Sequence, residues 1–425
     1  MDKKMRVLWV CNRPVASVSK DNNKSITNKE GWLDTLFEML DNNSEIEMGL
    51  CHADEGAEKN YASGSVKVYT VRENYNNLHV YEDRLEERFK EIYEDFRPDI
   101  VHIFGTEYPH TLGAVKAIEN KDKVLISLQG ICEKCAEHYL DFLPKSAINH
   151  LTLRDVLKGD TLKKQKKHFM DRAANEKKAL KEAMNVTGRT EFDREYSKEI
   201  NKDARYFYLG ETLRNVFYQG DVWNEENIDK HVIYFSQGNY PIKGLHVMLE
   251  ALNEVVKVYP DTVLKVGGDI ITGGTLKKNL LIGAYGSYIK KYIKKNNLGG
   301  NVEFTGSIPA DKVKENLLSS SVFVSSSVIE NSPNSVAEAM ILGVPVISSY
   351  VGGVPSIMMK DVDGRFFNSG DKDMLAEEIT DLFKKKDLGH VKDMIVNARN
   401  RAEAITTARP IMKLCLIYIR RLTLK

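Results

Sequence analysis

Short apolar runs in the C-terminal half of the chain alternate with segments that have helical spacing. The run SVFVSSS, residues 321–327, is apolar and β-branched, which is typical of a buried strand. A serine and a proline then provide an N-cap and a first-turn proline, which predicts a helix over residues 333–342. Gly343 and Pro345 end that helix, and the next strand covers residues 344–348. A strand, a helix and a strand joined by short links indicate a parallel sheet.

Two carboxylates lie where this unit would bind a ligand. Glu330 follows the first strand, and Glu338 lies between one and two turns inside the helix. Ligands of parallel sheets lie at the carboxyl ends of the strands, and the amides at a helix start attract phosphate. Carboxylates beside a phosphate site can accept hydrogen bonds from hydroxyls, which suits a sugar linked through a diphosphate to a nucleoside. A capped helix with two surface glutamates is the alternative. The residues around the helix start are Asn331, Ser332, Asn334 and Ser335.

The N-terminal half shows a similar alternation of strands and helices. Strands are predicted at residues 5–11, 46–51, 66–71, 99–104, 124–128 and 186–190, with the last strand of this half in ARYFYLGETLR, and helices near 31–40, 82–94 and 110–119. The second half restarts with a strand and a glycine-bearing loop in HVIYFSQGNYPIKG, before an amphipathic helix opens at Lys243. We therefore predict an α/β chain with two similar halves.

Length and composition are those of a soluble globular chain. Its 425 residues suggest two or three domains, and 61 basic against 60 acidic residues give no general reason to expect nucleic acid. The apolar run at residues 7–11 is too short for a signal-peptide core or a membrane span. Five cysteines, an odd number, favour a reducing cytoplasm over a disulfide framework.

Three further motifs allow two interpretations each. The lysine-rich, largely helical region 149–183 is either a solvated face or a surface that contacts membranes. Cys132, Cys135 and His138 have zinc-like spacing, but structural zinc needs four ligands and no second pair lies nearby, so ordinary thiols are favoured. The D-x-D of residues 361–363 is either a metal-binding motif or a plain turn, and the turn is favoured because a short strand follows at residues 365–367. No metal site and no obligatory cofactor are expected.

The segment ENSPNSVAEAMILGVPVISSYVGGVP resembles the donor-binding segment of glycosyltransferase family 4, the retaining glycosyltransferases with two Rossmann-like domains. The resemblance implies the GT-B architecture, two doubly wound parallel-sheet domains facing across a cleft. It implies that Glu330 holds sugar hydroxyls and helps to place the anomeric carbon, and that Glu338 accepts hydrogen bonds from the ribose. Gly352 and Gly353 are expected to bring backbone close to the donor phosphates or sugar.

The resemblance assigns further donor contacts. In NYPIKG, Lys243 corresponds to the family's lysine that neutralises the departing diphosphate, whereas Gly238 occupies the position of the family's arginine. Gly306 and Ser307 lie in a loop where relatives hold the base or ribose. Gly31 corresponds to a loop glycine near the diphosphate, with a simple loop glycine as the alternative.

Acceptor contacts are expected from the first half. PDIVHIFGTEYPH resembles the family's fourth-strand segment and brings Glu107 and His110 to a strand end, and Gln129 follows the next strand. Either Arg189 or the helix start at residues 331–335 is expected to replace the missing arginine, because departing charge must be stabilised by something in the site.

These features together predict a glycosyltransferase of hexosyltransferase type that transfers a sugar from a nucleotide-diphosphate sugar to a carbohydrate, lipid-linked or other hydroxyl acceptor, with bacterial surface polysaccharide or glycoconjugate assembly as the setting. The predicted location is the cytoplasm, with contact at the inner face of the membrane as an option. Alternatives are a sugar-nucleotide epimerase, a phosphorylase, or a silent donor-binding protein. The predicted domains are 1–212 (acceptor side), a linker at 213–229, 230–408 (donor side), and a helix at 409–425 that packs on the first domain.

Overall fold

The computed structural model describes residues 4–21, 31–228, 231–274, 280–384 and 388–423. They form two compact units. The first comprises residues 1–133, 168–214 and 406–425, and the second comprises 134–167 and 215–405. Among the described residues, no helix combines the length and apolarity needed to cross a membrane.

The first unit is built on an eight-stranded sheet with strand order β3-β4-β2-β1-β5-β6-β7-β8. Its strands are β1 (Met5–Cys11), β2 (Ile46–Asp54), β3 (Asn60–Ser63), β4 (Val66–Arg72), β5 (Ile100–Phe104), β6 (Val124–Ser127), β7 (Asn185–Gly188) and β8 (Arg205–Tyr208). All neighbours pair in parallel except β3, which is antiparallel to β4 at the edge. The apolar patterns predicted the parallel strands but not β3. This strand has only four residues, NYAS, and no apolar run.

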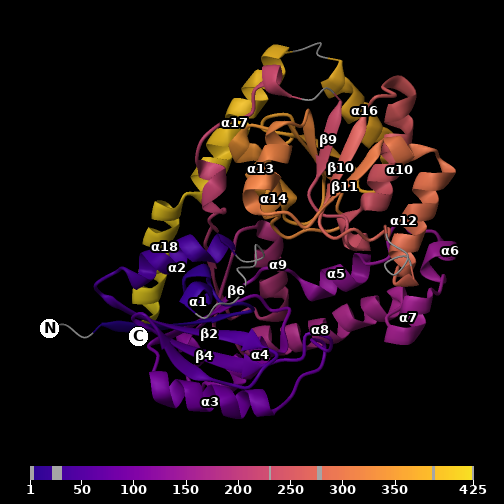
Figure 1. The fold of residues 1–425 in the computed structure, drawn as a ribbon. Coiled ribbons are helices and arrows are strands. Elements are labelled where there is room, and N and C mark those ends of the chain that lie inside the picture. The colour runs from indigo at the N-terminus through magenta and orange to yellow at the C-terminus, as the bar shows by residue number, and fades with distance from the viewer. Residues whose placement is uncertain (1–3, 22–30, 229–230, 275–279, 385–387, 424–425) are drawn as a thin grey trace. The chain divides into compact units, whose positions relative to one another are not determined.

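Helices cover both faces of this sheet, since each face has its own apolar core (Figure 1). On one face, Phe89 and Val115 pack with Leu8 and Val10 of β1; on the other, Trp9 packs with residues of α2 and α18. The apolar stripe of α18 is Ile411, Cys415, Ile419 and Leu422. The helices of this unit are α1 (Ala16–Asp21), α2 (Gly31–Asp41), α3 (Arg84–Phe96), α4 (Pro109–Ala117), α9 (Glu191–Ile200), α18 (Ala408–Thr423) and parts of α5 (Cys132–His138) and α8 (Leu162–Glu182).

The second unit is built on a six-stranded, fully parallel sheet with strand order β11-β10-β9-β12-β13-β14. Its strands are β9 (Val232–Phe235), β10 (Val263–Gly267), β11 (Val302–Gly306), β12 (Val322–Ser325), β13 (Val346–Ser349) and β14 (Arg365–Phe367). Its helices are α6 (Lys145–Ile148), α7 (Leu153–Lys158), α10 (Leu245–Val258), α12 (Ala284–Lys295), α13 (Ala310–Leu318), α14 (Asn334–Leu342), α15 (Val354–Ile357), α16 (Lys372–Phe383) and α17 (Leu388–Thr406). The predicted fold class, with two α/β parallel-sheet domains, is confirmed.

Residues 134–167 belong to the second unit although they interrupt the first in sequence. The carboxylate of Asp155 accepts a hydrogen bond from the amide of Ala284, 3.0 Å away at the start of α12. The His246 ring lies 3.0 Å from the carbonyl oxygen of Asp141. The sequence interpretation kept this segment with the first domain, because local patterns do not tell against which sheet a helix packs.

Candidate functional site

Lys243 and Glu330 form an ion pair at the carboxyl edge of the second sheet. Lys243 lies in the loop that follows β9, and Glu330 lies in the loop that follows β12, the neighbouring strand. Their side chains are 21% and 12% exposed. Burial is the largest single influence on the pKa of Lys243 and lowers it. The charge and hydrogen bond of Glu330, together with nearby Tyr240, outweigh burial, so the pKa of Lys243 is raised and the ammonium form is held. The site therefore contains a fixed cation beside a carboxylate.

Close backbone packing holds together the two loops that carry this pair. Gly244 has φ +71°, and a Cβ there would lie 1.8 Å from the carbonyl oxygen of Ser326. The hydroxyl of Ser326 donates to the carbonyl of Gly244 at 2.9 Å, and the hydroxyl of Ser327 donates to Glu330 Oε1 at 2.8 Å. Only glycine permits this approach of the two loops. The turn that carries Lys243 is thus packed directly on the loop that carries Glu330.

A second glycine contact holds the other side of the Glu330 loop. Gly352 has φ +49°, and a Cβ there would lie 2.0 Å from the carbonyl oxygen of Glu330. The amide of Gly353 donates to the same carbonyl at 3.0 Å. The two glycines therefore have a structural role at Glu330, in addition to the donor contacts predicted for them.

Helix α14 begins at Asn334, one residue later than the predicted start, with Pro333 at the N-cap position. Proline offers no side-chain cap there. The first amides of an α-helix and its dipole favour an anion at this end. Glu338 is 6% exposed within this helix, and Asn331 and Ser332 are also buried. Asn334 and Ser335 are partly exposed. The predicted residues are thus brought to one loop and one helix start.

A cavity of about 510 Å³ opens at the same edge of the sheet, within the second unit. Its lining comes from the loops after β9, β10 and β11 and includes Gly306 and Ser307. Asp269 accepts hydrogen bonds from Ser307 at 2.9 Å and from Asn239 at 3.1 Å, which forms a polar wall. Arg154, from the segment that interrupts the first unit, also lines the cavity. Nothing in the sequence indicated that Arg154 lies at this cavity. Asp269 could have been proposed, because it directly follows the two glycines at the end of β10, where a parallel sheet binds its ligands.

Gly238 packs inside the second unit, below these loops. A Cβ there would lie 2.7 Å from Val266 and 2.8 Å from Leu245, and its amide donates to Gly267 at 3.2 Å. A long side chain does not fit at this position without movement of its neighbours. The close contacts with Val266 and Leu245 therefore favour glycine at this position, where the resembled family has arginine.

In the first unit, Glu107 folds back over two glycines at the carboxyl edge of its sheet. Glu107 Oε1 accepts from the amide of Gly130 at 2.7 Å, and Arg172 donates to the Glu107 carbonyl at 2.6 Å. A Cβ at Gly105 would lie 2.5 Å from Glu107 Oε2. That oxygen is buried and has no hydrogen-bond partner among the described residues.

Gln129 and Arg189 are joined by Glu211, which the sequence did not single out. Gln129 donates to Glu211 Oε1 at 2.6 Å, and Arg189 contacts Glu211 Oε2 at 3.1 Å. Both members of the ion pair are nearly buried, at 10% and 8% exposure of their side chains. A phosphate would therefore have to compete with Glu211 for Arg189.

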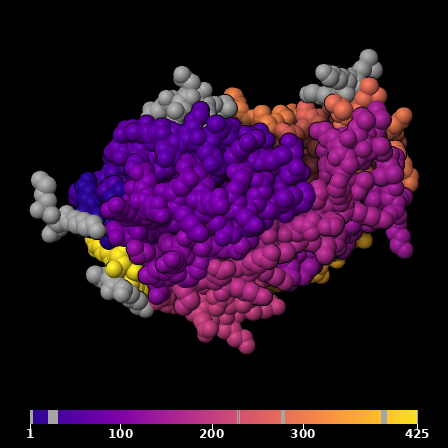
Figure 2. Space-filling model, turned by 90° about the horizontal axis from the view of Figure 1, so that it is seen from below, coloured from indigo at the N-terminus to yellow at the C-terminus, as the bar shows by residue number. Residues whose placement is uncertain are grey.

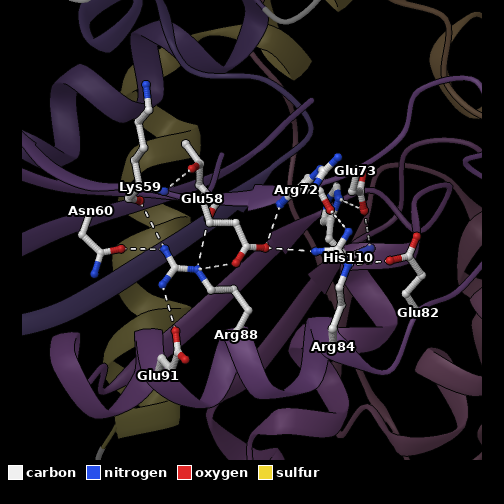
Figure 3. Close-up of polar contacts among 11 residues, drawn as sticks. Glu58, Lys59, Asn60, Arg72, Glu73, Glu82, Arg84, Arg88, Glu91 and His110 are labelled. Carbon is white, nitrogen blue, oxygen red and sulfur yellow. Dashed lines mark hydrogen bonds and ion pairs between the residues drawn. The ribbon is translucent and has the colours of Figure 1, made fainter. Parts of the chain in front are cut away.

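His110 is completely buried and pairs with Glu73 at the end of β4, as Figure 3 shows. Glu73 Oε1 lies 3.0 Å from His110 Nδ1 and also accepts from the His110 amide at 2.8 Å. Figure 3 also shows Arg88 among Glu58, Asn60 and Glu91. Arg88 donates to Asn60 at 2.6 Å and to the carbonyl of Thr70 at 3.2 Å, so it fixes the edge strand β3 to β4.

Glu176 is a buried carboxylate beside these strand ends. It accepts hydrogen bonds from Thr106 at 2.5 Å, Tyr196 at 2.8 Å and the amide of Cys132 at 3.3 Å. Burial outweighs these donors and raises the pKa of Glu176 to about 7. Its position on the lysine-rich helix α8 gave no sequence signal.

Two other expectations concern Gly31 and a metal site. Gly31 is the first residue of α2, and a Cβ there would lie an ordinary 3.4 Å from Arg214, so sterics do not require glycine. The loop that precedes it, residues 22–30, lies outside the described residues. In the described part of the chain, no three His, Cys, Asp or Glu side chains are placed to hold a metal ion.

Comparison with known proteins gives a family match for the second unit. Residues 222–401 match the model of the glycosyl transferases group 1. A putative glycosyltransferase of Bacillus subtilis, YtcC, is 30% identical over 181 residues, which are 42% of this chain and 42% of that protein. The sequence match thus spans less than half of this curated relative.

Solved structures match along the whole chain. Sucrose-phosphate synthase from Thermosynechococcus elongatus has a TM-score of 0.71 at 16% identity and covers 99% of both chains. Anabaena HepE in complex with UDP-glucose has a TM-score of 0.64 at 16% identity and covers 98% of this chain and 100% of its own. The chain therefore has the GT-B fold of two parallel-sheet units, and its residues 222–401 match the glycosyl transferases group 1.

Proposed function

We propose that the chain is a retaining glycosyltransferase of family 4 that transfers a sugar from a nucleotide-diphosphate sugar to a hydroxyl acceptor. The observation that carries the proposal is the Lys243–Glu330 pair in the loops at the carboxyl edge of the second sheet, next in sequence to the start of α14. These residues and Glu338 all fall within the segment that matches the glycosyl transferases group 1. The complex of HepE with UDP-glucose makes UDP-glucose the first donor to test.

The site offers the charges that such a reaction needs. The bond between the anomeric carbon and the phosphate oxygen breaks, and negative charge develops on the departing diphosphate. The ammonium of Lys243 and the amides of α14 would bind that charge. As Lys243 turns to the diphosphate, Glu330 becomes able to accept hydrogen bonds from the sugar hydroxyls and to place the anomeric carbon.

In the proposed retaining reaction, the acceptor oxygen attacks on the face that the diphosphate leaves. A bond forms between the acceptor oxygen and the anomeric carbon, and the acceptor proton passes to the departing phosphate oxygen. No protein base is required in this scheme. The cavity lined by Ser307, Asp269 and Arg154 has room for a nucleoside, and Glu338 would accept hydrogen bonds from the ribose.

The acceptor is proposed to bind the first unit at the ends of β5 and β6, near Glu107 and Gln129. The buried Oε2 of Glu107, for which the described residues provide no hydrogen-bond partner, can accept a hydrogen bond from a hydroxyl. A hexosyl donor, a cytoplasmic location and a role in surface polysaccharide or glycoconjugate assembly belong to the same proposal. No metal takes part in it.

Thermal unfolding with a panel of nucleotide sugars tests donor binding, because a ligand of the native state raises the unfolding temperature. We expect at least one UDP- or GDP-sugar to stabilise the protein. Glu338→Ala should weaken that response, whereas Glu377→Ala, a change at an exposed residue of α16, should leave it intact. No response to any member of the panel would refute the proposal.

Product analysis separates the proposed reaction from its rivals. A transferase releases free nucleotide and a glycosylated acceptor, an epimerase releases a modified sugar without an acceptor, and a phosphorylase consumes free phosphate. Anomeric configuration in the product, read by NMR, tests retention. Inversion would remove the family 4 assignment while leaving sugar transfer in place.

A further inference from the structure

A cluster of exposed aliphatic side chains lies on α7 and the residue two positions before it. Leu151, Leu153, Val156 and Leu157 are 61%, 56%, 64% and 71% exposed. Leu153, Val156 and Leu157 have the i, i+3, i+4 spacing that places side chains on one face of a helix. So dense a group of exposed large apolar residues marks an interaction surface.

The opposite side of α7 is anchored, so the exposed face has a defined position. Thr152 and Asp155 form a capping box, and Gly159 ends the helix in the left-handed conformation. Asp155 is 1% exposed and also accepts from the amide of Ala284. Because Asp155 points into the second unit, the aliphatic face points outward.

A second segment extends the apolar surface. Leu280 and Leu281 are 64% and 49% exposed. They precede Gly283, whose Cβ position lies 3.2 Å from the guanidinium of Arg154 on α7, and Leu281 and Arg154 line the same cavity. We call the surface formed by residues 151–157 and 280–281 the α7 patch.

The chain around the α7 patch is strongly basic. Residues 145–167 contain seven Lys or Arg and two Asp, a formal charge of +5, whereas the whole chain has a net charge of +1. Both aspartates, Asp155 and Asp160, pair with Arg154. The lysines at positions 145, 158, 163, 164 and 167 are exposed.

We propose that the α7 patch docks on an anionic lipid surface. Leucine and valine would enter the headgroup region while the surrounding lysines meet acidic headgroups, a combination that supports reversible peripheral binding. A second copy of this chain fits less well, because the same positive charges would face each other. In Figure 2 the magenta part of the chain, which includes α7 and the start of α8, reaches the molecular surface.

The lysine-rich region 149–183 is predicted to be either a solvated face or a membrane-contacting surface. Within it, lysines lie at the start of α8, whereas the exposed aliphatic side chains lie on α7 and on the distant residues Leu280 and Leu281. The proposal does not depend on the proposed catalytic activity, since it concerns surface residues and requires neither donor nor acceptor.

Sedimentation with vesicles tests the α7 patch. The full chain, without nucleotide, is mixed with vesicles of phosphatidylcholine alone or with about one third phosphatidylglycerol. We expect binding to the anionic vesicles, little binding to neutral ones, and a decrease as salt is raised. Absence of sedimentation with anionic vesicles at low salt would refute the proposal.

Variants separate the apolar from the charged contribution. The pair Leu153→Ser with Leu157→Ser should lower the vesicle partition coefficient by at least about tenfold. The pair Lys163→Ser with Lys164→Ser should lower it by about fivefold for each lysine on anionic vesicles only. Val258→Ser is the matched control, because Val258 is 60% exposed at the end of α10, outside the patch.

Folding and self-association are checked on the same samples. The exposed leucines contribute little to stability, so the unfolding temperature of the double variant should match that of the wild type. If it drops, Leu151→Ser, which lies outside the helix, replaces the pair. Unchanged vesicle binding by a folded leucine variant, or a dimer that this variant converts to a monomer, would overturn the assignment to lipid.

Discussion

Replacement of Glu176 by glutamine should make the first unit more stable above neutral pH. Glu176 is buried, and burial raises its pKa from 4.5 to about 7. At 1.36 kcal/mol per pKa unit, this difference corresponds to about 3 kcal/mol. Glutamine has the same shape but cannot ionise, so it removes the cost of burying the charge.

The sign of the effect follows from proton binding. Below pH 4.5 the carboxyl is protonated in both the folded and the unfolded chain, and ionisation contributes nothing. Between pH 4.5 and about 7, the folded state keeps the proton that the unfolded state releases, so the wild type loses stability as pH rises. The loss is complete above about pH 7. The glutamine variant does not undergo this loss.

Hydrogen bonding adds an offset that does not depend on pH. Thr106 and Tyr196 donate to Glu176, and an amide nitrogen can accept from neither, so one hydroxyl must turn at a cost of about 1 kcal/mol. The variant should therefore be slightly less stable than the wild type near pH 4.5. It should be about 2 kcal/mol more stable at about pH 8.

Denaturant unfolding followed by tryptophan fluorescence measures this difference. Trp9 and Trp32 lie in the first unit, so the signal reports largely on it. Unfolding is measured from about pH 5 to about pH 8. Glu199→Gln, at an exposed residue of α9, is the control and should show no such trend. A difference between Glu176→Gln and wild type that stays constant with pH, or grows toward acid, would refute the reasoning.

Three other changes probe the site and the fold. Glu330→Gln should chiefly lower kcat, whereas Glu338→Ala should chiefly weaken donor binding, by about 1–3 kcal/mol; steady-state kinetics and donor titration would show the reverse if the roles were exchanged. Gly244→Ala should lower the free energy of unfolding by about 2–4 kcal/mol and abolish turnover, because its Cβ would lie 1.8 Å from the Ser326 carbonyl oxygen. Normal activity of this variant would mean that the turn can shift. Arg88→Ala should cost about 2–4 kcal/mol in denaturant unfolding, because it leaves buried hydrogen-bond acceptors near β3 without a donor, and should leave donor binding unchanged.

The strands of both sheets were predictable because burial on both faces imposes continuous apolar runs, as in β1 and β12. The edge strand β3 was not, because its pairing depends on Arg88 and on contacts across the sheet edge. The residues of β3 alone do not indicate these contacts.

The positions of Glu330 and Lys243 at strand ends also followed from sequence, because the carboxyl ends of parallel strands meet at one edge. That they form an ion pair, locked by Gly244 against Ser326, is a tertiary fact. The same holds for Glu211, which contacts both Arg189 and Gln129, the latter 82 residues away in the sequence.

The amino-acid sequence alone therefore determined the alternation of strands and helices, the two-sheet fold, and the loops that carry the candidate donor site. Tertiary structure decided which unit holds residues 134–167, which face of α7 is exposed, and that burial raises the pKa of Glu176. The reason is physical. Periodicity records whether a residue is buried, whereas partners, pKa values and surface patches depend on side chains that are distant in sequence and meet only in the folded chain.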